Sequence, residues 1–149
     1  MLAAAARIAV VAPSGVVDLP RIEAGMAVLR GWGFAPELLP HAGNRLRYLA
    51  GTDEERLADL REAFSGRWDA VWMARGGYGL ARIAAALLSG PLARVPLIGF
   101  SDGTALLNGL ADLGVPTVHA PVINSLAGWA DEDSLAALRR VLAEIGRAS

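Results

Sequence analysis

The chain contains neither lysine nor cysteine. All 14 basic residues in its 149 positions are arginine, which excludes a Schiff-base lysine and the lysine of a phosphate-binding P-loop. Without cysteine there is no thiolate nucleophile, disulfide or zinc–thiolate site. The only histidines are His41 and His119, which argues against a histidine-rich metal centre. Covalent chemistry would therefore need a hydroxyl or a carboxylate, and we expect neither a metal nor another cofactor.

Long hydrophobic runs and charge clusters are also missing. No apolar stretch approaches the roughly 20 residues that span a bilayer. The apolar run before Arg7 is short, lacks a basic start and leads directly into a strand-like segment, unlike a signal peptide. The net charge is −1 and the arginines are scattered, so we expect no nucleic-acid or membrane partner. These features predict a cytoplasmic protein, and 149 residues suffice for one domain with a real core.

Strand-like apolar runs and helix-like segments alternate along the chain. The strands are expected at 7–12, 34–39, 69–74, 95–100 and 115–119. The helices are expected at 18–31, 52–64, 80–88, 102–113 and 131–145, the last ending at Gly146. The second begins with Thr52-Asp-Glu-Glu55, which matches a capping box. This order predicts an α/β fold, a three-layer α/β/α parallel sheet of flavodoxin-like type. Packing is the expected role of Trp32, Trp68, Trp72 and Trp129.

Ser101 lies in a G-x-S-x-G pattern, Gly99-Phe-Ser-Asp-Gly103, between a predicted strand and a predicted helix. In this setting a serine occupies a sharp turn with its hydroxyl clear of the sheet, and the first helical amides can face a developing oxyanion. The same letters are also compatible with an ordinary helix N-cap after a buried strand. The motif alone leaves nucleophile and cap open as alternatives.

A second unusual loop follows the third predicted strand. Its sequence, Arg75-Gly-Gly-Tyr-Gly79, places three glycines in four positions, which allows a backbone to turn tightly and approach a ligand closely. In parallel sheets ligands bind beyond the carboxyl ends of the strands, where this loop and Ser101 both lie. We therefore predict an oxyanion hole formed by the Asp102 amide and an amide of Gly76 or Gly77. A simple tight turn is the alternative.

Other polar residues are further candidates for the site. Arg75, Tyr78 and His119 are candidate substrate-binding residues, although Arg75 could instead hold its loop by pairing with a neighbouring acid. His119 ends a strand and could act as a general base or be structural. We expect the Asp102 side chain to cap its own helix. We expect His41 to be solvated. Ser14 and Ser125 follow strand-like segments but lack the context of a nucleophile elbow, and Tyr48 and Arg45 could reach the cleft from their loop.

These blocks resemble the serine LD-carboxypeptidases, a family that includes muramoyl-tetrapeptide carboxypeptidase and the microcin C self-immunity peptidase. The resemblance extends over nearly the whole chain, and two blocks, Ala74-Arg-Gly-Gly-Tyr-Gly79 and Gly99-Phe-Ser-Asp102, are specific at this separation. Further matches are Ala12-Pro-Ser-Gly15, the segment 49–60 and Thr117-Val-His-Ala-Pro121. Gly103 and Ala120 depart mildly from the family, which commonly has a larger apolar residue and a glycine at these positions.

The resemblance implies that Ser101 is the nucleophile and that the Asp102 amide and a glycine amide of the 76–77 pair form the oxyanion hole. It implies a murein-derived peptide as substrate, cleaved between an L-centre and a terminal D-alanine, or a peptide–nucleotide antibiotic in the microcin branch. The family's catalytic glutamate and histidine belong to a C-terminal domain. Residues 1–149 then form the N-terminal, nucleophile-bearing domain, which needs that domain or a second chain, and the full-length enzyme is expected to be a homodimer.

Two further hypotheses come from other readings of the same residues. A self-contained hydrolase would use Ser101 with His119 as its base. A non-catalytic, flavodoxin-like module would use the glycine loop to bind a nucleotide, although a third glycine at the dinucleotide spacing is missing. An isolated nucleophile-bearing half should also expose an apolar face that a partner covers.

Overall fold

The computed structural model describes residues 2–128 and 130–145, and within them it forms one all-parallel sheet. The strand order is β2-β1-β3-β4-β5, with each strand parallel to its neighbours. This is the predicted α/β, flavodoxin-like order. The strands are β1 (Arg7–Val11), β2 (Ala35–Leu38), β3 (Ala70–Met73), β4 (Leu97–Gly99) and β5 (Thr117–His119).

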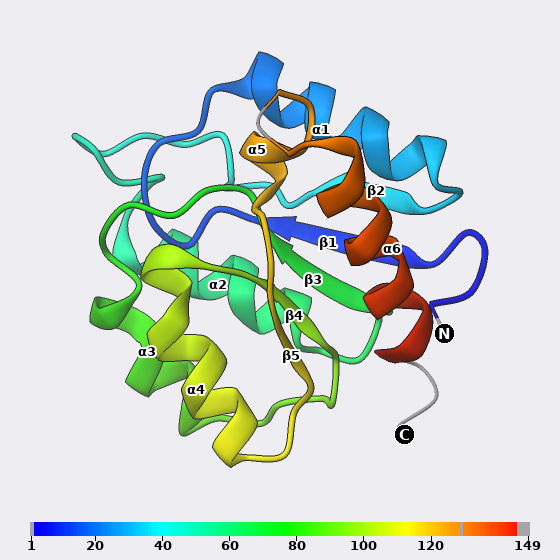
Figure 1. Cartoon of the computed structure of the whole chain (residues 1–149). Coiled ribbons are helices and arrows are strands. Elements are labelled where there is room, and N and C mark those ends of the chain that lie inside the picture. The colour runs from blue at the N-terminus through cyan, green and yellow to red at the C-terminus, as the bar shows by residue number, and fades with distance from the viewer. Residues whose placement is uncertain (1, 129, 146–149) are drawn as a thin grey trace.

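Helices cover both faces of the sheet, which gives the three predicted layers (Figure 1). One face is covered by α2 (Asp53–Ala63), α3 (Ala81–Leu88) and α4 (Thr104–Asp112). The other face is covered by α1 (Leu19–Gly31), α5 (Ile123–Leu126) and α6 (Glu132–Ile145). None of the helices within the described residues is long and apolar enough to span a bilayer.

The continuous apolar character of β1 follows from this double cover. Ala9 and Val11 point into the core beneath α2, α3 and α4, whereas Ile8 and Val10 point into the core beneath α1, α5 and α6. All four are fully buried. A strand with both faces buried needs apolar residues at every position, so it cannot show the alternation of a half-exposed strand.

The edge of the sheet that matters for function is set by the strand order. Strand β1 pairs with β2 on one side and β3 on the other, so successive connections from the centre leave in opposite directions. Such a switch point opens a crevice at the carboxyl ends of the strands. The loops leaving β1, β3 and β4 meet at this edge, and they carry Ser14, the glycine loop 75–79 and Ser101.

Several details differ from the sequence-based expectations. The short helix α5 was not predicted, because four residues are too few to show a helical period. The helix after β4 begins at Thr104 rather than 102, since a 3-10 turn, η1 (Ser101–Gly103), comes first. Trp68 and Trp72 are buried as predicted, while Trp32 is only partly buried. The expected helix end at Gly146 and the packing of Trp129 lie outside the described residues.

Helix α2 begins with the capping box that its sequence predicts. The Thr52 hydroxyl accepts from the Glu55 amide at 3.1 Å, and the Thr52 amide donates to the Glu55 carboxylate at 2.9 Å. In the first turn, the Arg82 Nε–H is shared between the two carboxylate oxygens of Asp53, at 2.9 and 3.1 Å. A terminal nitrogen of Arg82 also donates to Asp53, at 2.8 Å. This ion pair joins α2 to α3, and the Arg82 hydrogen bonds are the largest cause of the lowered pKa of Asp53.

This lowered pKa predicts how the link between α2 and α3 responds to pH. A carboxyl with a lower pKa in the folded state stabilises the fold above its unfolded pKa and loses that contribution as the pH falls. Asp53→Asn should therefore reduce the free energy of unfolding at pH 7 and have progressively less effect below about pH 4. Urea titrations across this range test the effect, with Glu54→Gln as the control. A penalty that is independent of pH would contradict it.

A pair of glycines in α1 gives a matched test of packing. A Cβ on Gly25 would lie 2.1 Å from the Ile123 carbonyl oxygen, so α1 and α5 pack through backbone contact, whereas a Cβ on Gly31 would meet nothing within 4 Å. Gly25→Ala should destabilise the protein by about 1–3 kcal/mol despite the better helix propensity of alanine. Gly31→Ala should be neutral or slightly stabilising. Equal effects in chemical denaturation would disprove the close packing.

Candidate active site

Ser101 lies on a sharp turn at the carboxyl end of β4. Phe100 is extended, with φ −159°, and Ser101 then adopts a left-handed backbone conformation with φ 62°. Residues other than glycine, asparagine and aspartate rarely adopt this conformation, which costs about 1–2 kcal/mol. The turn leaves Ser101 exposed at the start of the 3-10 turn, as in a nucleophile elbow.

Gly76 of the glycine loop lies directly against Ser101. A Cβ on Gly76 would stand 2.9 Å from the Ser101 Cβ, 3.0 Å from its Oγ and 3.7 Å from the Asp102 amide nitrogen. Any other residue at position 76 would push the serine aside, so here the close approach requires glycine. The structure thus brings together residues 76, 101 and 102, which the sequence separates by a whole strand and helix.

The peptide between Gly76 and Gly77 is held from one side. Its carbonyl accepts a hydrogen bond from the Gly15 amide at 3.1 Å. Because the carbonyl and amide of a trans peptide point in opposite directions, the Gly77 N–H points away from Gly15. Among the described residues, the amides of Gly76, Gly77 and Asp102 donate to no protein acceptor. These donors are the kind that could stabilise an oxyanion beside the Ser101 hydroxyl.

The side chain of Asp102 does not cap its own helix, and that expectation was wrong. Its Oδ2 accepts a hydrogen bond of 2.6 Å from the Ser14 hydroxyl and one of 2.9 Å from the Leu80 amide. The carboxylate therefore ties the turn after β4 to the loop after β1 and to the start of α3. The carboxylate binds these two donors in place of a local cap, because the Ser14 hydroxyl and the Leu80 amide would otherwise be left unpaired near the core.

Ser14 is the residue that sequence reasoning missed. It was set aside because it lacks an elbow context, yet it is completely buried and donates to Asp102. Its position at the end of a central strand, within the Ala12-Pro-Ser-Gly15 block, was the available signal. A buried hydroxyl needs a partner, and here that partner is the acid next to the candidate nucleophile.

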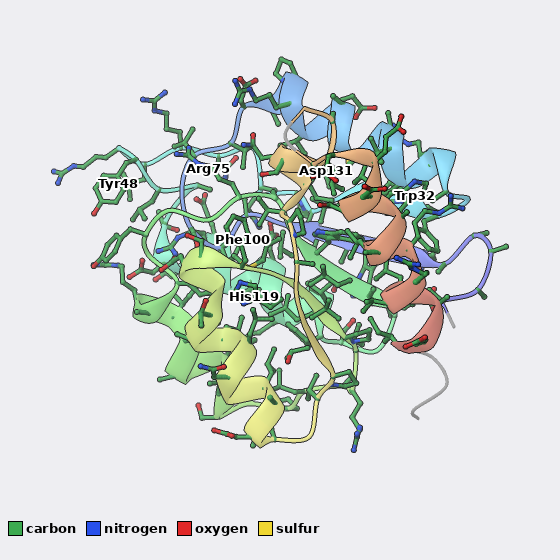
Figure 2. All side chains as sticks on the ribbon, viewed as in Figure 1. Trp32, Tyr48, Arg75, Phe100, His119 and Asp131 are labelled. Atoms are coloured by element: carbon green, nitrogen blue, oxygen red, sulfur yellow. The ribbon has the colours of Figure 1, made fainter. Side chains whose placement is uncertain are left out.

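Arg75 and Tyr78, two candidate substrate-binding residues, lie at the rim of this edge. The Arg75 guanidinium donates to the Val16 carbonyl, so it holds the loop through a backbone group rather than a neighbouring acid. Tyr78 is half exposed, and its ring lies 5.8 Å from that of Tyr48. The Arg45 Nε donates to the Arg47 carbonyl. Figure 2 shows Tyr48 and Arg75 on the same side of the molecule.

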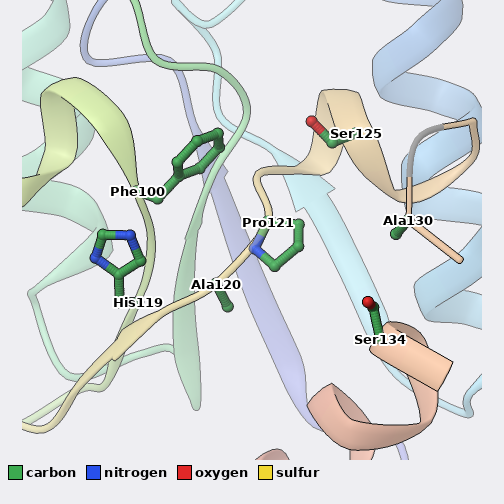
Figure 3. A pocket seen from close by; sticks show the side chains of 7 residues that line it. All are labelled: Phe100, His119, Ala120, Pro121, Ser125, Ala130 and Ser134. Atoms are coloured by element: carbon green, nitrogen blue, oxygen red, sulfur yellow. The ribbon is translucent and has the colours of Figure 1, made fainter.

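His119 lines a pocket that also includes Phe100, the residue before Ser101. Its ring centroid is 6.2 Å from that of Phe100. The two rings form one wall of this pocket of about 350 Å³, and Pro121, Ser125 and Ser134 are among the residues that complete it (Figure 3). Within the described residues no hydrogen bond joins His119 to Ser101. This geometry does not form the nucleophile–base pair of a self-contained hydrolase.

His41 is not simply solvated, contrary to expectation. Its Nδ1 lies 2.8 Å from a carboxylate oxygen of Asp59, and its backbone amide donates to the other oxygen at 3.1 Å. Burial raises the pKa of Asp59, and the hydrogen bonds from His41 partly offset this. The pair anchors the loop after β2 on α2. Among the described residues, no group of three or more acidic or histidine side chains could hold a metal ion.

The departure at Gly103 has a steric reason. A Cβ at this position would lie 2.3 Å from the Met73 sulfur, and one on Gly99 would lie 2.6 Å from the same atom. The long Met73 side chain thus occupies the space that a larger residue at 103 would need. The Met73 side chain fills this part of the core in place of a larger residue at position 103, and the elbow at Ser101 is retained.

Comparison with known proteins identifies a family for this chain. A model described as the LD-carboxypeptidase N-terminal domain matches residues 8–120. A Streptomyces coelicolor protein, named only as a carboxypeptidase, is 47% identical over 132 residues, covering 81% of this chain and 42% of its own. A murein tetrapeptide carboxypeptidase of Pseudomonas aeruginosa is 40% identical over 124 residues, covering 80% of this chain and 40% of its own.

The solved structures support the same fold. The microcin C7 self-immunity protein matches with a TM-score of 0.79 and 23% identity, covering 95% of this chain and 45% of the other. At this identity the likeness shows the fold alone. The chain spans about two fifths of the length of the two curated relatives.

The contact between Ser14 and Asp102 predicts a specific cost of removing one hydroxyl. Ser14→Ala leaves the carboxylate with one donor fewer and should lower the free energy of unfolding by about 1–3 kcal/mol. Ser89→Ala is the matched control, because its hydroxyl only reaches the Ala86 carbonyl on the surface, at 3.3 Å. Chemical denaturation of both variants is the measurement. A Ser14→Ala variant as stable as the control would exclude a structural hydrogen bond to Asp102.

Proposed function

The chain belongs to the LD-carboxypeptidase family, and from this premise we propose that it is the nucleophile-bearing domain of a serine carboxypeptidase. Its substrate is a cytoplasmic murein tetrapeptide, cleaved between an L-centre and the terminal D-alanine. We favour murein peptide over a microcin-type antibiotic because the relative at 40% identity is named for murein tetrapeptide, whereas the likeness to the microcin protein supports only the fold.

The observation that carries the proposal is the exposed, left-handed Ser101 in contact with Gly76. A structural N-cap would need neither a strained backbone nor a glycine at a position where an added Cβ would lie 3.0 Å from the serine Oγ. Backbone strain of this kind persists where the surroundings impose it, which is common at catalytic positions. Here the imposing groups are Ser14, Leu80 and the Asp102 carboxylate between them.

The chemistry follows from the positions of these groups. The Ser101 hydroxyl attacks the scissile carbonyl and gives up its proton to a base, and the carbonyl oxygen becomes an oxyanion. The amides of Asp102 and of Gly76 or Gly77 donate to that oxygen. Collapse of the tetrahedral intermediate expels D-alanine, whose amine takes a proton, and leaves an acyl-enzyme. Water then hydrolyses the ester and restores the serine.

The base is supplied from outside the described residues. No histidine is hydrogen-bonded to Ser101 within them. The family resemblance implies a catalytic glutamate and histidine in a C-terminal domain, and we propose that this domain or a second chain supplies them. Exposed large apolar residues gather on loops at the carboxyl edge, consistent with a partner surface there: Leu46, Tyr48, Tyr78 and Phe100. Arg75, Tyr78 and His119 would then contact the peptide, and the whole protein would form a homodimer.

Two purified proteins test the proposal: the 149-residue chain alone, and the chain fused to the C-terminal domain of the Pseudomonas relative. The chain alone should be inactive on an L–D tetrapeptide, because loss of triad partners removes roughly 10⁴-fold or more of the rate. The fusion should release D-alanine, and Ser101→Ala should abolish that release. D-alanine release over time is the measurement.

Ser89→Ala in the fusion is the control and should retain full activity. Robust hydrolysis by the chain alone would refute the need for a second domain. Activity in the Ser101→Ala fusion above that of the isolated C-terminal domain would refute the assignment of the nucleophile.

A further inference from the structure

Arg56 of α2 is a charged side chain buried in the core, with 1% exposure, and the proposed mechanism does not use it. Taking a guanidinium out of water costs several kcal/mol unless its donors are paired. One terminal nitrogen donates to Asp53 at 2.5 Å. The Nε is buried and has no partner among the described residues. A buried charge with an unpaired donor is a poor way to stabilise a core.

The other terminal nitrogen of Arg56 joins two loops of the active-site edge. It donates to the Pro13 carbonyl at 2.5 Å and to the Gly79 carbonyl at 2.9 Å. The next residue in each loop, Ser14 or Leu80, donates to Asp102. Arg56 therefore binds the two loops through the carbonyls of Pro13 and Gly79. The Asp102 carboxylate binds the same loops one residue further on, through the donors of Ser14 and Leu80.

Gly79 is fitted to this guanidinium. Its φ is 122°, and a Cβ there would lie 3.0 Å from the donating nitrogen of Arg56 and 2.5 Å from the Leu49 side chain. The last glycine of the loop thus allows both the backbone turn and the approach of the cation. The glycine loop is held at both ends, by Gly15 at Gly76 and by Arg56 at Gly79.

We propose that Arg56 is a positioning residue, which fixes the glycine loop so that Gly76 and its neighbouring amide stay against Ser101. This rests on the function proposed above. Arg56 touches neither Ser101 nor the candidate oxyanion donors, so it acts through the backbone between Gly79 and Gly76. Misplacing a catalytic group by about 1 Å can cost on the order of 100-fold in rate. Oxyanion donors act in the transition state, so the loss should appear in kcat rather than KM.

The first test uses the 149-residue chain and does not depend on activity. Arg56→Met keeps the length and volume of the buried stem but removes all donors, and Arg56→Lys restores a cation that can reach a carbonyl. Amide NMR of Arg56→Met should show chemical-shift changes at Gly76 and Gly77. It should also show at least 10-fold faster hydrogen exchange at Gly15 and Leu80, whose amides are hydrogen-bonded in these two segments. These amides should return part of the way to their original behaviour in Arg56→Lys. Arg61→Met, an exposed arginine on the same helix, is the control and should leave them unchanged.

The second test measures kinetics in the active fusion. Arg56→Met should lower kcat by about 10- to 100-fold while KM changes less than about twofold, and Arg56→Lys should recover part of kcat. Unchanged loop amides with unchanged kcat would overturn the proposal, as would a uniform loss of exchange protection across the sheet. If Arg56→Met does not fold, the loop amides and kcat of Arg56→Lys are compared with those of Arg61→Lys. A change in Arg56→Lys alone supports the proposal, and no change in either variant overturns it. A fusion without activity would contradict the proposed function, while the NMR result would still decide the role of Arg56.

Discussion

One carboxylate oxygen, Oδ2 of Asp102, accepts hydrogen bonds from the loop after β1 and from the start of α3 while belonging to the turn after β4. Three chain segments that leave three neighbouring strands are thereby brought to one point. The energy of a charge-assisted hydrogen bond in a partly buried setting is enough to outweigh the strain at Ser101. The elbow is therefore imposed by the surrounding fold and not by the local sequence.

The sheet order places these segments together. Because β1 lies between β2 and β3, the order in which successive strands join the sheet reverses at β1. The strands are all parallel, so the loops after β1 and β3 leave from the same edge. Glycines then allow the backbones to meet, as the contact between Gly15 and the Gly76 carbonyl illustrates. Beneath the elbow, the long Met73 side chain packs against Gly103, which has no side chain to compete for the same space.

Much of this could be predicted from the sequence. Continuous apolar runs, the capping box at Thr52 and the alternation of elements gave the parallel α/β sheet, because these signals are local. The hydrogen-bond partners of Ser14, Arg56 and Asp59 could not be predicted, since each partner lies on another element of the fold. The prediction for the Asp102 side chain was wrong for the same reason. The local sequence indicates a cap of its own helix, whereas in the fold the carboxylate accepts hydrogen bonds from Ser14 and Leu80 on other elements.

The central claim is that tertiary contacts hold Ser101 in a left-handed conformation against the glycine loop. A high-resolution crystal structure of the chain measures this directly. The account predicts a positive φ at Ser101, with its Oγ facing Gly76 and the Asp102 carboxylate bound to Ser14 and Leu80. A Ser101 with helical φ, or with its hydroxyl turned away from Gly76, would contradict it.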